Sequence, residues 1–469
     1  MAASSKSLSP VEFMNGPREK IMYVSCLQPV SVHGKKGKCD YLATVDVDPE
    51  SPTYCKVINR LYMPEPGDEL HHFAWNACIS CPDREKSHKY LILPGFYSGN
   101  LHIIDVTSDP LKPKMIKFIK GKEIKDKFDL TYPHTVHCIP SGEVMIHTLG
   151  DKDGNAKGGF FLLDGQTFEP KGLWNHEPPK EKIMGHDFWY QPRHNIMISS
   201  ELGAPNKFSK GFDPADMAKG FYGTKLHFWH WNERELFNSI DLGEDGAIPM
   251  EIRFLHNPDA TDAYIVCAVG ASVFHISLSK KGNWEAKRVI KIPHKIVKDW
   301  QLPFIPALIT DCLISLDDKY LFITCYLHGD VRMYDISKPD EPKLVSQVFV
   351  GGSTLTDTVV KVTKDEELVK QPERQHVKGR ALHGGPHMVQ LSRDGKRLYV
   401  SLSIMTPWDK QFYPKLAEKG GVMILLDVSP TGMKLSQEFL IDFGTEPDGA
   451  VRAHEMRYPG GDCTSDIWV

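Results

Sequence analysis

The sequence of 469 residues has no apolar run of the roughly 18–20 residues that a membrane-spanning helix needs. Its longest candidate, residues 263–276, is short and includes glycine, serine and histidine. The first residues, MAASSKSLSP, have no apolar core of the kind found in secretory signals. Neither charge dominates, since 56 Lys and Arg face 60 Asp and Glu, a net charge of −4. We therefore expect no integral membrane segment and no charge-driven binding to nucleic acid, while peripheral association with a membrane stays open.

Cysteine is also sparse, with ten residues in the whole chain and no regular spacing of the kind seen in disulfide frameworks. This usage is typical of a reducing compartment, so we expect a cytosolic protein. Cys78 and Cys81 form one CxxC pair, but no second pair completes a zinc ribbon and no βαβ pattern supports a redox motif. Because two histidines lie close by in the sequence, the pair is a candidate thiol relay, with plain packing as the alternative.

Helical periodicity is nearly absent, because few apolar patterns with 3.6-residue spacing last beyond two turns. Instead, 37 glycines and 33 prolines separate many short apolar runs, which predicts an all-β protein. One alternating strand motif recurs, and its copies end at Asp46, Asp105, Asp164, Trp231, Ser277, Asp335 and Asp427. Seven copies of a unit of several short strands predict a seven-bladed β-propeller.

The two ends of the chain carry complementary parts of one repeat unit. Strands of the outer type come first, before any inner strand, and the last inner strand starts at His454. We therefore expect the N- and C-terminal strands to pair in the last blade, which removes exposed sheet edges. Residues 1–469 then form a single propeller domain, with a flexible tail at 1–15 and long loops at 203–224 and 352–385. These loops are either covers over a site or solvated decorations.

The 21 histidines are not scattered, because several occupy the same place in the repeat. The opening position of an inner strand holds His72, His134, His186, His387 and His454. Inner strands line the channel of a propeller, so these imidazoles should form an arc across five neighbouring blades. They cannot all be protonated at short range, and a bound cation would relieve the conflict. The alternative is a set of imidazoles that are simply hydrogen-bonded. Imidazole ligands suit Zn, Cu, Fe or Ni, and spacing does not separate copper from zinc.

Three histidines from consecutive blades, His72, His134 and His454, are the central candidates for metal ligands. His71 and His137 are either ligands or partners of ligands, because neighbouring side chains on a strand point to opposite faces unless the strand is bulged.

Two acids, Glu251 and Asp311, are expected on the opposite arc of the channel. They are candidate catalytic proton acceptors or groups that orient an imidazole. Their purely structural role would be to pair with an arginine such as Arg253.

Long motifs of the chain resemble one known family. They include LATVDVDPESPTYCKVI, DELHHFAWN, SGEVMIHTLGD, LHGDVRMYDISKP and HEMRYPGGDCTSDIW, and the resemblance runs in order from about residue 16 to 469. On these residues the chain is similar to the animal cytosolic members of the selenium-binding protein family, also called methanethiol oxidases.

The resemblance implies an enzyme that oxidises methanethiol with dioxygen and water to formaldehyde, hydrogen sulfide and hydrogen peroxide. It implies copper held by histidines and bound selenium as cofactors. The matching positions are the HH pair His71 and His72, the HTVH residues His134 and His137, and His454 of HEMRYP. Cys55 of SPTYC corresponds to the residue linked with selenium. The resemblance also implies the cytosol, with the nucleus and the membrane periphery as further locations, and an association with protein transport that no residue here supports.

Two alternatives differ in class from an oxidase. The first is a non-catalytic propeller that binds selenium at Cys55 or acts as a transport or scaffold protein. The second is a zinc or calcium hydrolase of the same architecture, which is disfavoured because such sites are rich in carboxylates whereas this arc is mostly imidazole. In the oxidase hypothesis, Asp311, Glu251 or an unligated imidazole such as His137 takes the thiol proton.

Overall fold

The computed structural model describes residues 9–29, 37–78, 89–459 and 464–469. Within these residues, seven sheets have four antiparallel strands each. Four of them follow one another along the chain: β4 (Ala74–Trp75), β5 (Tyr90–Pro94), β6 (Leu101–Asp105) and β7 (Lys114–Ile119); β8 (Thr131–Cys138), β9 (Glu143–Gly150), β10 (Ala156–Asp164) and β11 (Pro170–Leu173); β12 (Phe188–Gln191), β13 (Ile196–Ser199), β14 (Lys225–His230) and β15 (Glu235–Asp241); β16 (Pro249–Phe254), β17 (Ala263–Cys267), β18 (Ser272–Leu278) and β19 (Trp284–Lys291).

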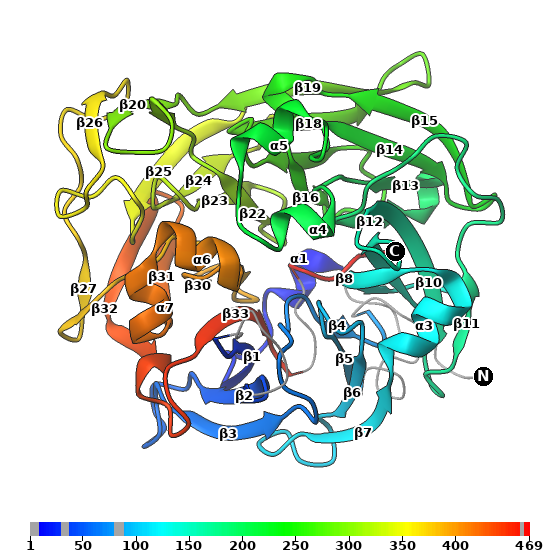
Figure 1. Ribbon diagram of the computed structural model, residues 1–469, viewed down its shortest axis with the longest axis horizontal. Helices are drawn as coiled ribbons and strands as arrows, with labels where there is room; N and C mark the ends of the chain where they lie inside the picture. Colours follow the sequence, from blue (N-terminus) through cyan, green and yellow to red (C-terminus); the bar gives the residue numbers. More distant parts are fainter. Residues whose placement is uncertain (1–8, 30–36, 79–88, 460–463) are drawn as a thin grey trace.

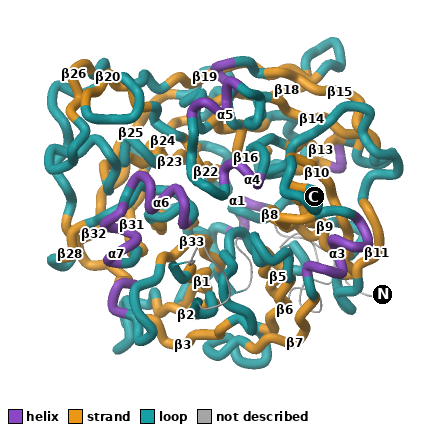
Figure 2. Tube along the Cα trace, in the orientation of Figure 1, coloured by secondary structure: helices purple, strands orange, loops and turns teal. Residues whose placement is uncertain are grey.

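The other three sheets include one that joins distant parts of the chain. They are β22 (Ile309–Ile314), β23 (Tyr320–Cys325), β24 (Asp330–Asp335) and β25 (Lys343–Phe349); β29 (Val389–Leu391), β30 (Arg397–Ser401), β31 (Val422–Ser429) and β32 (Gly432–Asp442); and β33 (Arg452–Arg457), β1 (Ile21–Leu27), β2 (Tyr41–Asp46) and β3 (Val57–Tyr62). In the last sheet β33 pairs antiparallel with β1, with Val24 opposite Met456. Figure 1 shows the sheets arranged around the middle of the view, and Figure 2 shows how much of the trace is strand.

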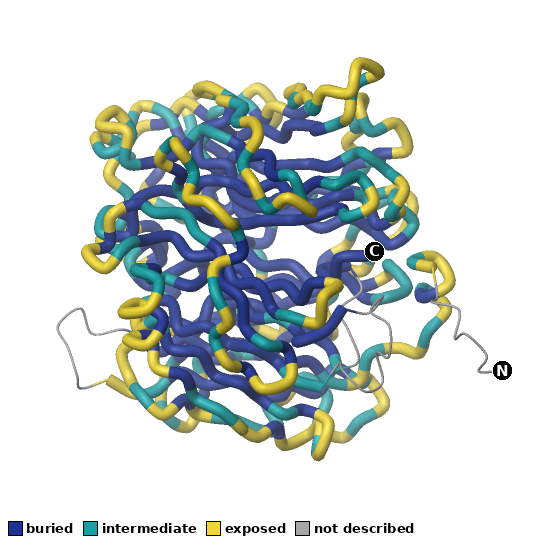
Figure 3. The backbone as a smooth tube through the Cα atoms, turned by 90° about the vertical axis from the view of Figure 1, so that its right-hand side faces the viewer, coloured by how far each residue is buried: buried dark blue, intermediate teal, exposed yellow. Residues whose placement is uncertain are grey.

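Burial falls from the first strand of a sheet to the fourth. All six residues of β22 are buried, whereas no residue of β25, the fourth strand of the same sheet, is fully buried. A similar contrast separates β16, which is wholly buried, from β19, where only Ile290 is buried. Figure 3 shows buried chain inside and exposed chain at the margins. The prediction of an all-β protein is confirmed, and this gradient is consistent with a propeller, whose inner strands are its most enclosed.

Short helices and small sheets lie in the segments between the strands of the seven four-stranded sheets. The helices are α1 (Pro10–Phe13), α3 (Gly121–Phe128), α4 (Pro205–Phe208), α5 (Pro214–Ala218), α6 (Thr406–Phe412) and α7 (Pro414–Lys419), with 3-10 turns η1 (Pro192–His194), η2 (Glu244–Gly246) and η3 (Phe443–Thr445). The small sheets combine β21 (Phe304–Ile305), β20 (Lys295–Lys298) and β26 (Lys361–Lys364), and β27 (His376–Val377) with β28 (Arg380–Ala381). The predicted loop 203–224 therefore carries α4 and α5, and 352–385 carries β26, β27 and β28. None of the helices in the described part of the chain has the length and apolar character that a bilayer crossing needs.

Residues near the two ends of the chain pack together. Ser9 and Glu12 form a capping box that starts α1, so part of the segment predicted as a tail is helical. The ring of Phe13 meets Trp468 edge-on at 5.9 Å between centroids, and both pack on Leu316. Ile467 is fully buried against a different set of sheets. In Figure 1 the C-terminus lies to the right of the middle of the view and of α1.

His147 of β9 makes the stability of the fold sensitive to acid. Its ring stacks on Phe160 at 4.2 Å between centroids, and burial, followed by nearby His227, lowers its pKa from 6.5 to about 3. Between these two values the unfolded chain binds more protons than the folded chain, so the folded state loses stability as the pH falls.

We expect His147→Leu to remove this acid sensitivity. From about pH 6 to about pH 4, the free energy of unfolding of the variant relative to the parent should rise by about 1.4 kcal/mol per pH unit. Urea denaturation across this range measures both proteins. Parallel pH profiles would show that His147 takes up a proton in the folded state.

Candidate metal centre

Six imidazoles gather from five sheets, where they lie in the first strand or just before it. They belong to His71, His72, His134, His186, His387 and His454. Ring centroids lie 4.2 Å apart for His72 and His134, 4.4 Å for His134 and His186, 4.7 Å for His71 and His454, and 4.8 Å for His387 and His454. All six side chains are at least nine-tenths buried. Four of the five predicted ligands therefore share one cluster with His186 and His387. The fifth, His137, instead packs its ring against Phe188 and Trp189.

Bulges in the first strands aim these side chains. The pairing of β8 with β9 shifts register between Pro133 and Val136, and the pairing of β33 with β1 shifts between Ala453 and Met456. A bulge bends a strand and breaks the alternation of its side chains. His134 and His454 lie at these two bulges, which explains how they reach the cluster although strict alternation would place neighbours on opposite faces.

The imidazoles form one side of a small internal cavity with a volume of about 20 Å³. The rest of its lining is almost wholly apolar and comprises Phe96, Leu202, Ile248, Met250, Ala268, Leu308, Thr310, Ile404, Met405 and Trp408. Helix α6 supplies Trp408, whose indole Nε1 donates to the carbonyl of Phe208 in α4 at 2.9 Å. The loop at 203–224 and helix α6 thus meet at the edge of the cavity. We call this space the chamber.

Burial keeps most of the clustered imidazoles neutral. It lowers the pKa of His134, His186, His387 and His454 well below the ordinary value, and the neighbouring histidines lower it further. His72 differs, because two carboxylates face it. Burial alone would lower its pKa, but Glu455 and then Glu251 raise it to about 9. A metal that binds His72 must therefore displace a proton.

The two predicted acids lie behind the chamber, around the guanidinium of Arg253. Glu251 Oε2 accepts from Arg253 at 2.9 Å, and its Oε1 has no hydrogen-bond partner. That free oxygen lies 3.9 Å from His72 Nε2 and 3.8 Å from His186 Nδ1. Asp311 accepts backbone N–H groups on both oxygens, from Cys312 at 2.7 Å and Val389 at 2.9 Å. Glu251 therefore faces the imidazoles, whereas Asp311 ties two strands together.

Three further buried acids belong to this neighbourhood and were not singled out from the sequence. Asp187 pairs with Arg253 at 2.8 Å, and burial followed by Glu251 raises its pKa to about 7. Glu455 lies 3.4 Å from His72 Nδ1, and Glu69 lies 2.8 Å from His71 Nε2. Each of the three stands within two positions of a clustered histidine in the sequence. That adjacency was the available signal.

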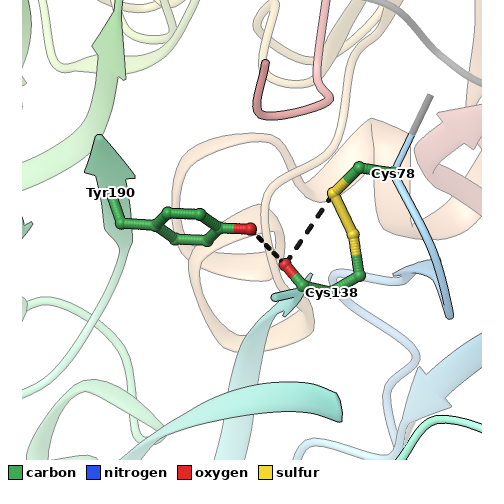
Figure 4. Close-up of a disulfide and its surroundings, with 3 residues drawn as sticks. All are labelled: Cys78, Cys138 and Tyr190. Atoms are coloured by element: carbon green, nitrogen blue, oxygen red, sulfur yellow. Dashed lines mark hydrogen bonds between the residues drawn. A yellow bond between two sulfur atoms is a disulfide. The ribbon is translucent and has the colours of Figure 1, made fainter. Parts of the chain in front are cut away.

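The cysteines lie in separate places. Cys78 forms a disulfide with Cys138, and the carbonyl of Cys138 accepts a hydrogen bond from the hydroxyl of Tyr190 (Figure 4). The sparse cysteines did not predict this bond, which leaves Cys78 without a free thiol. Cys81 lies outside the described residues, so the thiol relay stays a prediction. Cys55 is half-buried at a positive φ of 65°, with its Sγ 3.9 Å from Lys378 Nζ, and burial raises its pKa.

The donor set fits a metal that prefers imidazole. No group of three or more His, Cys, Asp or Glu within the described residues is already arranged around a common metal position. However, buried nitrogens of the cluster lack hydrogen-bond partners: both of His454, Nδ1 of His186 and Nδ1 of His387. Such nitrogens are costly to leave unpaired, and a metal would satisfy them.

Comparison with known proteins gives consistent results. The family model of the 56 kDa selenium-binding protein (SBP56) matches residues 3–469. A methanethiol oxidase of Xenopus laevis is 52% identical over 464 residues, which cover 98% of each chain. Selenium-binding protein 2 of Mus musculus is 50% identical over 464 residues, covering 98% of this chain and 97% of the mouse protein. The crystal structure of a hypothetical selenium-binding protein from Sulfolobus tokodaii superposes with a TM-score of 0.85, at 34% identity and 98% coverage of both chains.

Proposed function

Because the chain belongs to the 56 kDa selenium-binding protein family, we propose that it is a copper-dependent methanethiol oxidase. It converts methanethiol, dioxygen and water to formaldehyde, hydrogen sulfide and hydrogen peroxide. The observation that carries this proposal is the cluster of six buried imidazoles beside an apolar chamber. The seven sheets are then the blades of a propeller formed by the whole chain, and the pairing of β33 with β1 supports its closure.

His72, His134 and His454 would hold the copper, with His71 as a fourth ligand and His137 as a supporting residue. Bound copper would supply one-electron steps, which the reaction of dioxygen with a closed-shell thiol requires. The apolar lining from Met405, Trp408 and Leu202 would receive the methyl group and exclude water from the chamber.

Glu251 is the base that the geometry favours. The thiol proton would pass through His186, which is not a proposed copper ligand, to the unpartnered Oε1 of Glu251, 3.8 Å from His186 Nδ1. Arg253 holds the other carboxylate oxygen at 2.9 Å and keeps the group in place. Asp311 remains the second candidate, although both of its oxygens already accept backbone N–H groups.

We expect Glu251→Gln to lower turnover about 100-fold, the lower range for a lost general base. Its copper content should stay at the parent level, because Glu251 is not a proposed ligand. Glu235→Gln, on the exposed outer strand β15, is the matched control. Parental turnover in Glu251→Gln, measured by oxygen uptake, would remove Glu251 from the mechanism.

Selenium would bind at Cys55, beside Lys378 and away from the chamber. Binding of selenium by the Cys55 thiol would not require the metal.

The test is oxygen uptake by purified protein before and after copper loading, with zinc loading as the control. Copper-loaded protein should consume oxygen with methanethiol and release formaldehyde, sulfide and peroxide in equal amounts. The alternative is a non-catalytic selenium-binding or scaffold protein. Copper-loaded protein that binds selenium but consumes no oxygen would establish that alternative.

A further inference from the structure

Glu69 is a fully buried carboxylate close to the proposed copper site, and it has no part in the proposed proton transfer. It is 0% exposed. Its Oε2 lies 2.8 Å from His71 Nε2, and both of its oxygens accept the backbone N–H of Thr406, at 3.1 and 3.2 Å. The burial of a carboxylate is costly unless it is well paired. These contacts compensate for that cost and fix the position of the group.

The contact with Glu69 decides which nitrogen of His71 is available. A carboxylate only accepts hydrogen bonds, so Nε2 of His71 carries the proton and donates to Glu69. The lone pair of the neutral ring is then on Nδ1. The ring has little freedom to turn, because it is stacked between Phe96 at 4.5 Å and His454 at 4.7 Å. His71 is thus held in one tautomer and one orientation.

Glu69 also connects His71 to the wall of the chamber. Thr406 is the first residue of α6, the helix that supplies Trp408. Buried Arg452 holds the start of this helix, since it donates to the hydroxyl of Thr406 and pairs with Asp409 at 2.8 Å. One carboxylate is therefore bound at the same time to a proposed ligand and to the helix that closes the chamber.

We propose that Glu69 is a positioning residue that fixes the Nδ1 of His71 for copper and couples this orientation to the closed position of α6. This role rests on the proposed function, because it assigns Glu69 to the same copper site. A displacement of α6 would take the Thr406 N–H from Glu69 and loosen His71. The state of the chamber wall and the state of the metal site are thereby linked.

The first test is Glu69→Gln in the full-length protein. A glutamine amide can keep the bond to Thr406 but presents N–H to His71, which moves the ring proton to Nδ1 and blocks that nitrogen. Loss of such a partner typically costs 10- to 100-fold in metal affinity, and we expect a loss in this range. Competition with a Cu(II) chelator gives the affinity, and the Cu(II) electron paramagnetic resonance spectrum should change as a nitrogen ligand is lost. The matched control is Glu65→Gln, whose side chain pairs with Asn100 and Lys120 instead.

The second test separates the contact with α6 from the carboxylate itself. Thr406→Pro removes the N–H that Glu69 accepts, and proline is tolerated in the first turn of a helix. Thr406→Ala keeps this N–H and removes only the hydroxyl. Thr406→Pro should therefore weaken Cu(II) binding more than Thr406→Ala does.

The outcomes distinguish the two proposals. Parental affinity and an unchanged spectrum in Glu69→Gln would overturn the role of Glu69 and leave the copper oxidase intact. Equal effects of the two Thr406 variants would overturn the coupling to α6. A parent protein that takes up no copper would overturn the proposed function and this role with it.

Discussion

A His72→Ala, His454→Ala double variant should contain no copper after loading and should consume no oxygen with methanethiol. The two imidazoles lie on neighbouring sheets, with ring centroids 5.9 Å apart, and both are buried beside the chamber. Removal of both takes away two of the three central ligands. Loss of a group that merely supports a ligand costs roughly 10- to 100-fold in metal affinity or activity, so the loss here should exceed 100-fold. Metal analysis and oxygen uptake measure it directly.

The control is a His176→Ala, His194→Ala double variant. These histidines lie outside the cluster, His194 in η1 and His176 at an exposed position. This protein should keep parental copper content and turnover. Normal turnover in the His72→Ala, His454→Ala protein would reject the histidine cluster as the active site, whatever the copper content of the control.

Deletion of residues 467–469 should unfold or nearly unfold the protein. Ile467 is fully buried and Trp468 is 4% exposed, in packing clusters that belong to different sheets. Removal of a buried isoleucine typically costs about 2–5 kcal/mol and removal of a buried tryptophan about 3–5 kcal/mol. Their sum approaches the whole free energy of unfolding of a typical protein, which is roughly 5–15 kcal/mol. Guanidinium denaturation followed by tryptophan fluorescence gives the free energy of unfolding.

A second substitution shows whether the packing seen here is responsible. Phe13→Ala should destabilise the parent, because its ring meets Trp468 at 5.9 Å. It should cost less in a Trp468→Ala background, where that partner is already absent but Ile467 is kept. Equal costs in both backgrounds, or a deletion without effect on stability, would show that the C-terminal residues do not hold α1 in place.

The all-β architecture could be predicted from the sequence because alternation and turn residues are local signals. The sequence motif predicted strands that end at residues such as Asp105 and Asp335, and these residues are the last of β6 and β24. The disulfide of Cys78 and Cys138 could not be predicted in this way. It joins residues 60 positions apart, and a pairing of this kind depends on how two sheets pack.

The sequence predicted those site residues in which one residue type, histidine, recurs at the same position of successive repeat units. This pattern predicted that His72, His134 and His454 lie close together. It also included His186 and His387, which belong to the cluster. It could not rank Glu251 against Asp311, because the difference lies in which backbone N–H groups already occupy the carboxylate oxygens. It also passed over Glu69, whose partner Thr406 lies 337 residues away.

The sheet made of β33, β1, β2 and β3 has a consequence for synthesis on the ribosome. β1 can pair with β2 as soon as both have emerged, but its other edge must wait for β33, several hundred residues later. Through most of translation the nascent chain therefore exposes one unpaired strand, of which six of seven residues are buried in the finished molecule. A chaperone that binds extended apolar segments would therefore bind β1 in the incomplete chain. It would be released once Arg452–Arg457 has been synthesised and pairs with β1.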